Sequence, residues 1–153
     1  MSPHQRLVVL GVAASDVHVV ANKLIEMHLR ANGLTVVNLG VCTPLREFAA
    51  AVRANPQAEA VIIGSLNGHA YEDLQELPAL RASGRLTCPV VLGGNLSVGS
   101  GKAHDEAAPF YALGVDRVLR DAAELLPALD GLRAEREAAT AADRSLRSLA
   151  VPA

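Results

Sequence analysis

The chain has 153 residues and a net charge of −2, a size that fits one domain with a substantial core. Half of the residues are hydrophobic but only 3% are aromatic, so Val, Leu, Ile and Ala must fill that core. The sequence lacks the basic surplus that nucleic acid or an anionic membrane attracts, and the aromatic platforms on which single-stranded bases stack. No apolar run approaches the roughly 20 residues that span a bilayer.

Two features bear on where the protein resides. Arg6 precedes the apolar run "LVVLGVAAS", which has the length of a short signal peptide. The run continues directly into a helical pattern, so we interpret it as a first strand. Cys42 and Cys88 are far apart and form no C-x-x-C pair, which favours reduced cysteines. We therefore expect a cytoplasmic protein.

Five strand-like segments alternate with helical segments along the chain. The segments are "RLVVLGV" (6–12), "LTVVNLG" (34–40), "EAVIIGS" (59–65), "CPVVLGG" (88–94) and a weaker "DRVLR" (116–120). Their nearly continuous Val, Ile and Leu content is typical of parallel strands that are covered on both faces.

Helical spacing of apolar residues marks the segments in between. The residues that carry it are Val20, Leu24, Met27 and Ala31 in the first helix, Leu45, Phe48 and Val52 in the second, and Leu74, Leu77 and Leu80 in the third. Gly33 is a stop signal, Thr43 before Pro44 predicts a cap, and Pro78 should bend or shorten the third helix. We expect a short helix near 105–113 and a last one from about residue 121.

This alternation predicts an α/β fold: a single Rossmann-like (flavodoxin-like) domain with a five-stranded parallel sheet and helices on both faces. We expect this domain to span residues 1–132, and the Ala/Arg/Glu-rich residues 133–153 to form a C-terminal helix end and tail. Ligands of such folds bind outside the carboxyl ends of the strands, at the switch point in strand order. Three loops with unusual residues fall at that edge: 15–18, 64–69 and 93–101.

The first loop places Asp16 and His18 two residues apart at the end of the first strand. An imidazole there can meet a ligand, and a carboxylate that accepts its other N–H fixes the tautomer, as in metal sites. Alternatively, Asp16 or Ser15 only caps the next helix and His18 lies in its first turn. The spacing alone leaves both interpretations open. A zinc site is disfavoured, since Cys42 and Cys88 are not suitably spaced to complete it.

The other two loops are rich in glycine and hydroxyl groups. In "GSLNGH", Ser65 ends a buried strand, where it can cap a turn while Gly68 supplies a positive φ. The loop "LGGNLSVGSG" has four glycines in residues 93–101, which permit close approach of backbone to a bulky ligand. It lacks the Lys-Ser/Thr ending of a P-loop, and it follows the fourth strand rather than the first, unlike a dinucleotide-binding loop.

Taken together, "SDVHVVANKLI", "GSLNGH" and "VVLGGNLSVG" resemble the D-x-H-x-x-G, S-x-L and G-G signatures of cobalamin-binding domains. The chain most resembles the small (sigma) subunits of adenosylcobalamin-dependent glutamate mutase (methylaspartate mutase), over residues 7–119. The sequence departs from the pattern at Ala21, where the family has a glycine beside the cofactor's nucleotide tail. We expect the extra methyl group to shift the tail or weaken binding without abolishing it.

The resemblance implies a role for each edge loop. His18 would be the lower axial ligand of cobalt in place of the cofactor's own dimethylbenzimidazole base, and Asp16 would accept its second N–H. The displaced tail would enter a slot beside the sheet, near Ser65 and walled by Gly93 and Gly94. The implied cofactor-binding residues, none of them catalytic, are Ser15, Asp16, Val17, His18, Val19, Ala21, Ser65, Leu66, Gly68, Gly93, Gly94 and Asn95.

The resemblance further implies an isomerase subunit that interconverts L-glutamate and threo-3-methylaspartate by a radical mechanism with adenosylcobalamin. Inactive alone, it would form a hetero-oligomer with a larger barrel-type catalytic subunit that encloses the substrate. An alternative is a corrinoid carrier for methyl transfer, although such carriers usually add an N-terminal helical bundle, whereas here the first strand begins by Leu7. A receiver-like signalling domain would need a clustered acidic pocket and a strand-end lysine, but Lys102 lies well beyond the fourth strand.

Overall fold

The computed structural model describes residues 5–94 and 107–150, which contain one parallel sheet with the strand order β2-β1-β3-β4-β5. The strands are β1 (Leu7–Val12), β2 (Thr35–Asn38), β3 (Ala60–Gly64), β4 (Val90–Gly93) and β5 (Arg117–Leu119). The predicted five-stranded parallel sheet is thereby confirmed. The order changes direction between β1 and β3, so the switch point lies where these two strands end.

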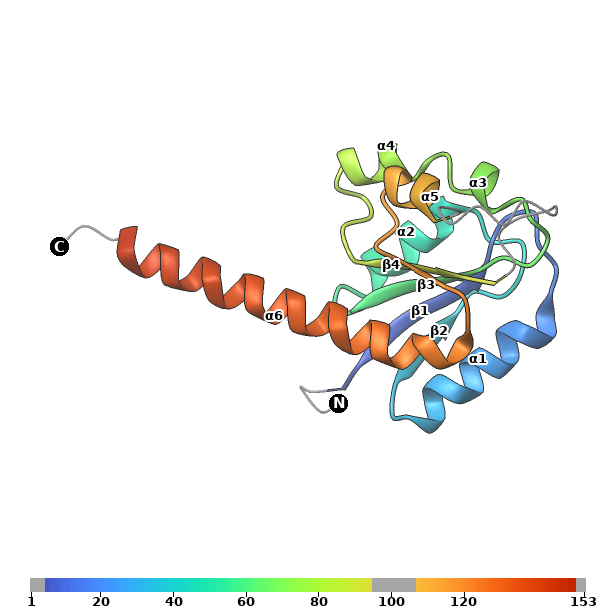
Figure 1. The fold of residues 1–153 in the computed structure, drawn as a ribbon, viewed down its shortest axis with the longest axis horizontal. Helices are drawn as coiled ribbons and strands as arrows, with labels where there is room; N and C mark the ends of the chain where they lie inside the picture. The colour runs from blue at the N-terminus through green and yellow to red at the C-terminus, as the bar shows by residue number, and fades with distance from the viewer. Residues whose placement is uncertain (1–4, 95–106, 151–153) are drawn as a thin grey trace.

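Helices cover both faces of the sheet (Figure 1). They are α1 (Val19–Ala31), α2 (Leu45–Ala54), α3 (Ala70–Asp73), α4 (Leu77–Ala82), α5 (Ala108–Leu113), the 3-10 helix η1 (Ala122–Glu124) and α6 (Leu125–Ala150). Figure 1 shows α2 to α5 on one face, and α1 and α6 on the other. Each face thus has its own apolar layer, which explains why every residue of β1 is buried.

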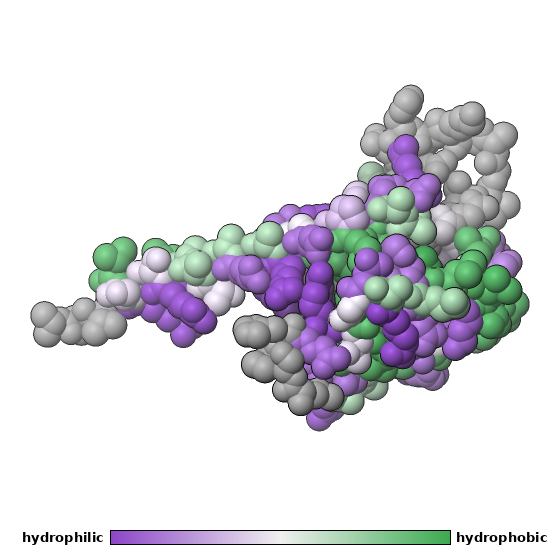
Figure 2. Space-filling view, turned by 90° about the horizontal axis from the view of Figure 1, so that it is seen from below, coloured by the Kyte–Doolittle hydropathy of each residue, from purple (hydrophilic) through white to green (hydrophobic). Residues whose placement is uncertain are grey.

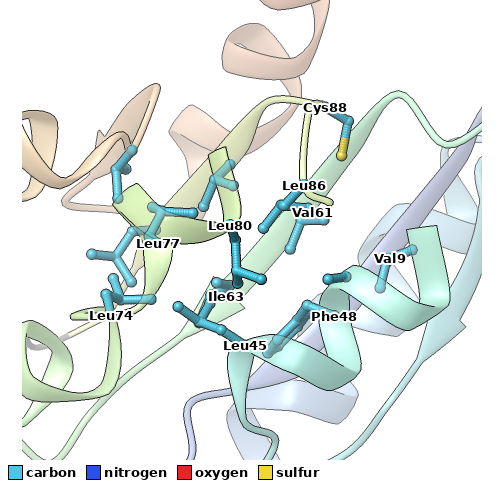
Figure 3. Packing of buried hydrophobic residues seen from close by; sticks show 14 of the residues in the cluster. Val9, Leu45, Phe48, Val61, Ile63, Leu74, Leu77, Leu80, Leu86 and Cys88 are labelled. Carbon is cyan, nitrogen blue, oxygen red and sulfur yellow. The ribbon is translucent and has the colours of Figure 1, made fainter. Parts of the chain in front are cut away.

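The core on the α2 side is built around Phe48. Figure 3 shows Val9, Val61 and Ile63 of the sheet facing Phe48 and the leucines of α4. Gly11 makes room for this ring, because a Cβ at that position would lie 2.6 Å from Phe48 Cζ. The glycine near the end of β1 therefore lets the ring pack against the strand.

Helix α1 forms where the spacing predicts it, but its regular apolar stripe faces outward. Val20, Leu24 and Met27 are exposed, whereas Asn22 and Leu29 are the buried residues of the helix. Helical periodicity identifies the apolar face of a helix but does not indicate whether that face packs on the core or faces solvent. In this fold the inner face of α1 borders a cavity at the sheet edge, described below.

Two helix starts differ from the sequence expectation. Pro44, rather than Thr43, is the residue that precedes α2, and the Thr43 hydroxyl donates to the Gly40 carbonyl instead of capping the helix. The predicted third helix is split into α3 and α4. Pro78 lies in the first turn of α4, where its missing N–H leaves no intrahelical hydrogen bond unmade.

The last helix begins at a capping box and runs beyond the sheet. Asp121 accepts the N–H of Ala123, while Glu124 accepts the N–H of Asp121. Leu132 is the last buried residue of α6, and the remainder of the helix to Ala150 projects from the body (Figures 1 and 2). A division of the chain at residue 132 stays a prediction. Among the described residues, no helix combines the length and apolarity needed to cross a membrane.

Candidate functional site

The carboxyl ends of β1, β3 and β4 meet at one edge of the sheet, next to the start of α1. Residues 13–18 follow β1, residues 65–69 follow β3, and Gly94 follows β4. Strand pairing fixes their proximity, since Val12 is in register with Gly64, and Gly64 with Gly93. The parts of the predicted loops that the structure describes therefore lie together, as the sequence indicates.

A buried carboxylate holds the imidazole of His18 at this edge. Asp16 is 1% exposed, and its Oδ1 accepts the His18 backbone N–H at 2.9 Å and lies 2.5 Å from His18 Nδ1. Its Oδ2 accepts the Leu66 N–H at 2.5 Å. The hydrogen bond to Asp16 assigns the ring proton to Nδ1 and leaves the lone pair on Nε2. Because the His18 side chain is 53% exposed, this imidazole can reach a ligand outside the protein surface.

The surroundings keep Asp16 in its charged form. Burial by itself would raise the pKa of this carboxyl group, but hydrogen bonds from Leu66 N–H and from the ring and backbone of His18 outweigh that effect. The pKa of Asp16 is consequently below its ordinary value. A carboxylate in this position increases the electron density that the imidazole can offer to a metal.

The geometry disfavours a helix cap as the only role of this loop. His18 precedes α1 with extended backbone angles, and its side chain makes no capping hydrogen bond. Asp16 accepts the N–H of His18 itself rather than an N–H inside the helix. The Ser15 hydroxyl donates to Asp73 Oδ2 at 2.6 Å.

Two further residues, which the sequence interpretation missed, join the loops after β1 and β3. The Asn67 amide donates to the Ser15 carbonyl at 2.8 Å, and Asp73 accepts both the N–H and the hydroxyl of Ser15. Asn67 lies inside the "GSLNGH" motif, so its position in the sequence could have identified it as a site residue. Nothing in the local sequence indicates that Asp73, on α3, reaches back to the first loop.

A cavity of about 190 Å³ opens beside His18, between α1, the strand ends and the start of α6; we call it the edge slot. Its walls are largely apolar. The predicted site residues that line it are His18, Ala21, Ser65, Leu66, Gly93 and Gly94. Lining residues that the sequence interpretation missed include Asn22, Ile25, Arg120 and Asp121. The sequence offers little to identify them. Asn22, for example, occupies a helix position that the apolar spacing does not single out.

Two residues that line this slot each carry a buried side-chain atom without a hydrogen-bond partner among the described residues. The two atoms are Ser65 Oγ, on a residue that is 0% exposed, and Asn22 Nδ2, on a residue that is 6% exposed. Unpaired buried polar groups destabilise a fold, so a pair of them around one cavity fits a bound ligand with polar atoms. The backbone at Gly94 approaches Ser65 closely: its φ is +118°, and a Cβ there would lie 2.1 Å from the Ser65 carbonyl oxygen.

The remaining predicted residues lie around the slot or outside the description. Val17 and Val19 flank His18 and are exposed. Gly68 has a φ of +81°, which serves the turn after β3. Ser15, Val17, Val19 and Gly68 are not among the slot-lining residues, and Asn95 lies outside the described residues.

These features define a class: an open α/β sheet with an exposed imidazole held by a buried carboxylate at its switch point and an apolar slot beside it. Residues 6–130 match the B12 binding domain family, and the chain belongs to this family. The resemblance drawn from the three motifs is thereby confirmed.

The curated relatives compared next are all named glutamate mutase sigma subunits. Each matches this chain over most of its length. The chain is 37% identical to glutamate mutase sigma subunit 1 of Haloarcula marismortui over 142 residues, which cover 93% of each chain. It is 37% identical to the glutamate mutase sigma subunit of Halobacterium salinarum over 135 residues, 88% of this chain and 90% of that one. It is 33% identical to the sigma subunit of Clostridium cochlearium over 115 residues, 74% and 83% of the two chains.

Solved structures share the fold. The methanol:cobalamin methyltransferase complex MtaBC from Methanosarcina barkeri matches with a TM-score of 0.67 and 28% identity over 84% of this chain and 46% of that one. A cobalamin-binding protein from Desulfitobacterium hafniense matches with a TM-score of 0.62 and 21% identity over 88% and 59%. This second likeness concerns the fold alone. The chain thus spans about half the length of these two solved chains.

Proposed function

We propose that the protein is the cobalamin-binding small subunit of a glutamate mutase-type carbon-skeleton isomerase. The observation that carries this proposal is the imidazole of His18, held by buried Asp16 at the mouth of a slot with two unpaired polar groups. A single protein nitrogen suffices for a cobalt ion whose other ligands come from a corrin ring. The names of the curated relatives support the reaction class.

His18 Nε2 is the proposed lower axial ligand of cobalt. Asp16 keeps the ring oriented and its lone pair directed outward, since the carboxylate holds the proton on Nδ1. When bound, adenosylcobalamin would supply a weak cobalt–carbon bond as a source of radicals. The chain's own residues bind and orient this cofactor, and none of them acts on the substrate.

The apolar surface around His18 suits the face of a corrin ring. Val17, Val19 and Val20 are exposed beside the imidazole. Figure 2 shows hydrophobic residues gathered at the end of the body opposite the projecting part of α6. A large apolar ligand on this end would cover them, and Ala21, Ser65 and Gly93 would hold a displaced nucleotide tail in the edge slot.

A separate catalytic subunit completes the proposed enzyme. The described fold is one open sheet with its helices, which offers no enclosed space for an amino acid above the corrin face. A larger barrel-type partner would therefore bind the substrate, L-glutamate or threo-3-methylaspartate, and form a hetero-oligomer with this chain. The chain alone would be inactive.

A corrinoid carrier for methyl transfer is the second candidate. It is favoured by the fold shared with the methanol:cobalamin methyltransferase complex. The same His18 site could serve a methyl group. The sigma subunits, however, are 30–38% identical to this chain and match over 72–93% of it and 79–93% of their own length. These matches favour the mutase.

Ligation can be tested with cobalt(II) cobalamin and protein that contains ¹⁵N-labelled histidine. A histidine ligand should change the electron paramagnetic resonance coupling from the triplet of ¹⁴N to the doublet of ¹⁵N. His18→Gly should abolish the doublet, whereas His28→Gln, which replaces an exposed histidine on α1, should preserve it. A triplet in the labelled wild type would mean that the cofactor's own base remains bound, against the proposal.

Turnover tests the division of labour. The purified chain with adenosylcobalamin should not convert glutamate, and addition of a glutamate mutase catalytic subunit should produce 3-methylaspartate. Isomerase activity of the chain alone would refute the need for a partner. Methyl transfer from a donor without any isomerase activity would instead favour the carrier.

A further inference from the structure

Ser15, the residue directly before Asp16, is exposed, yet each of its polar groups is bonded to another part of the chain. Its N–H and its hydroxyl donate to Asp73 Oδ2, at 3.3 and 2.6 Å. Its carbonyl and hydroxyl oxygens accept from the Asn67 amide, at 2.8 and 3.0 Å. Water could bond an exposed serine equally well, so these four contacts indicate that the fold holds this point of the loop.

The two partners of this serine, which we call the serine clamp, are themselves fixed. One is Asp73 on α3, and the buried side chains of Ala70 and Leu74 anchor this short helix to the core. The other is Asn67, whose side-chain oxygen accepts the His69 N–H at 3.0 Å. That contact turns the amide nitrogen of Asn67 toward the serine. The serine clamp therefore joins the loop after β1 to a part of the chain that the core holds.

Packing does little to hold the segment that carries His18. Val17 and Val19, on either side of it, are exposed, and so is half of the His18 side chain. The position of the imidazole depends instead on hydrogen bonds to the carboxylate of Asp16. The serine clamp fixes the backbone from which that carboxylate projects, because Ser15 directly precedes it. Loss of the clamp should consequently loosen the imidazole.

We propose that Asp73 is a positioning residue, which enables His18 to compete with the cofactor's own base for cobalt by holding Ser15. This inference rests on the proposed function. The competing base is tethered to the corrin ring, so its effective concentration at the metal is high. An imidazole that the fold already holds loses less conformational freedom on ligation than a loose one, and therefore competes better. Asp73 is not among the residues that line the edge slot, so its effect must pass through the loop.

The test uses Asp73→Ala, which removes both contacts to Ser15, in protein that contains ¹⁵N-labelled histidine. Anaerobic calorimetry with cobalt(II) cobalamin should show binding weakened by about 10-fold, the usual effect of one hydrogen bond to a charged group. Paramagnetic resonance of the saturated protein should show that part of the cofactor has returned to the ¹⁴N triplet of its own base. With cobinamide, which has no competing base, the same variant should keep the ¹⁵N doublet.

Glu72→Ala is the matched control, because it removes the neighbouring exposed carboxylate of α3 and leaves the contacts of Asp73 intact. It should keep the wild-type affinity and a complete doublet. Asp73→Asn retains an oxygen that can accept from Ser15, so it should keep more of the doublet than Asp73→Ala. Equal losses in these two variants would contradict the inference.

Two further results would overturn it. One is a complete doublet at wild-type affinity in Asp73→Ala, since the clamp would then be without effect on ligation. The other is loss of the doublet with cobinamide, because the loop would then have lost its structure rather than a competition. A triplet in the wild type would overturn the proposed function itself, and this inference with it.

A second variant covers the case in which Asp73→Ala does not fold. Ser15→Ala removes the hydroxyl that donates to Asp73 and leaves α3 unchanged. It should produce the same partial return of the triplet with cobalamin, and a complete doublet at wild-type affinity would contradict the inference. Where both variants fold, the losses of affinity should not add in the double variant, because both changes break the same contact. Additive losses would mean that Asp73 acts through another residue, against the inference.

Discussion

The carboxylate of Asp16 accepts the backbone N–H of Leu66, a residue 50 positions later in the chain. This bond joins the loop after β1 to the loop after β3 at the switch point of the sheet. The same carboxylate holds His18 through its other oxygen. The position of the imidazole therefore depends on the relative placement of two loops, and Asp16 links them.

Replacement of Asp16 by Asn tests this link. The variant keeps the side-chain shape but loses the charge, and an NH₂ group must face either His18 or Leu66. Cobalamin affinity and reconstituted activity should fall by about 10- to 100-fold, while the ¹⁵N coupling from His18 remains. His18→Gly should fall substantially further and lose that coupling. Wild-type affinity and turnover in Asp16→Asn would limit Asp16 to a structural role.

Substitution of Gly94 tests how closely two strand-end loops approach. Gly94→Ala places a Cβ 2.1 Å from the Ser65 carbonyl oxygen at a residue with φ of +118°. We expect a loss of about 1–3 kcal/mol in the free energy of unfolding from the backbone strain, and weaker cobalamin binding. Chemical denaturation and calorimetric titration measure both effects.

Gly93→Ala is the control for this prediction. Its Cβ would have Leu119 Cβ as its nearest neighbour at 3.9 Å, an ordinary contact, and its φ is not positive. This variant should unfold close to the wild type. Equal losses in the two variants would show that any side chain at the edge is harmful, whatever its contact with Ser65.

Ala21 stands where the family has a glycine, and the substitution Ala21→Gly restores the family residue. Ala21 lines the edge slot, so Ala21→Gly enlarges it by one methyl group. The unbound protein should lose about 1 kcal/mol of stability, because glycine is a poor helix former. Affinity for cobalamin should nevertheless rise relative to cobinamide, which lacks the nucleotide tail. An unchanged ratio of the two affinities, measured by calorimetry, would mean that the methyl group does not meet the tail.

The two cysteines should differ in reactivity. Cys42 is exposed, whereas burial raises the pKa of the Cys88 thiol and lowers its thiolate fraction at neutral pH. Brief treatment with iodoacetamide should modify Cys42 and spare Cys88, as read by peptide mass spectrometry. Both should react in denaturant. Rapid labelling of Cys88 in the folded protein would contradict its place in the core shown in Figure 3.

Local sequence patterns determined the sheet and the outline of the site. Apolar strands such as 6–12 and 59–65 form parallel strands because only burial on both faces accommodates them. The topology of such folds then places the loops with His18 and Ser65 at one edge. The sheet edge that carries these loops could therefore be predicted without knowledge of any tertiary contact.

The tertiary structure decided which atoms meet there. The contacts of Asp16 with Leu66, of Ser15 with Asp73 and of Asn38 with Asn22 join segments that periodicity treats independently. The same limit explains α1, whose apolar stripe faces outward while Asn22 lines the edge slot. Periodicity is a property of one segment, set by the helical or strand repeat. Contacts between segments depend on strand order and register, which the packing of the whole chain determines.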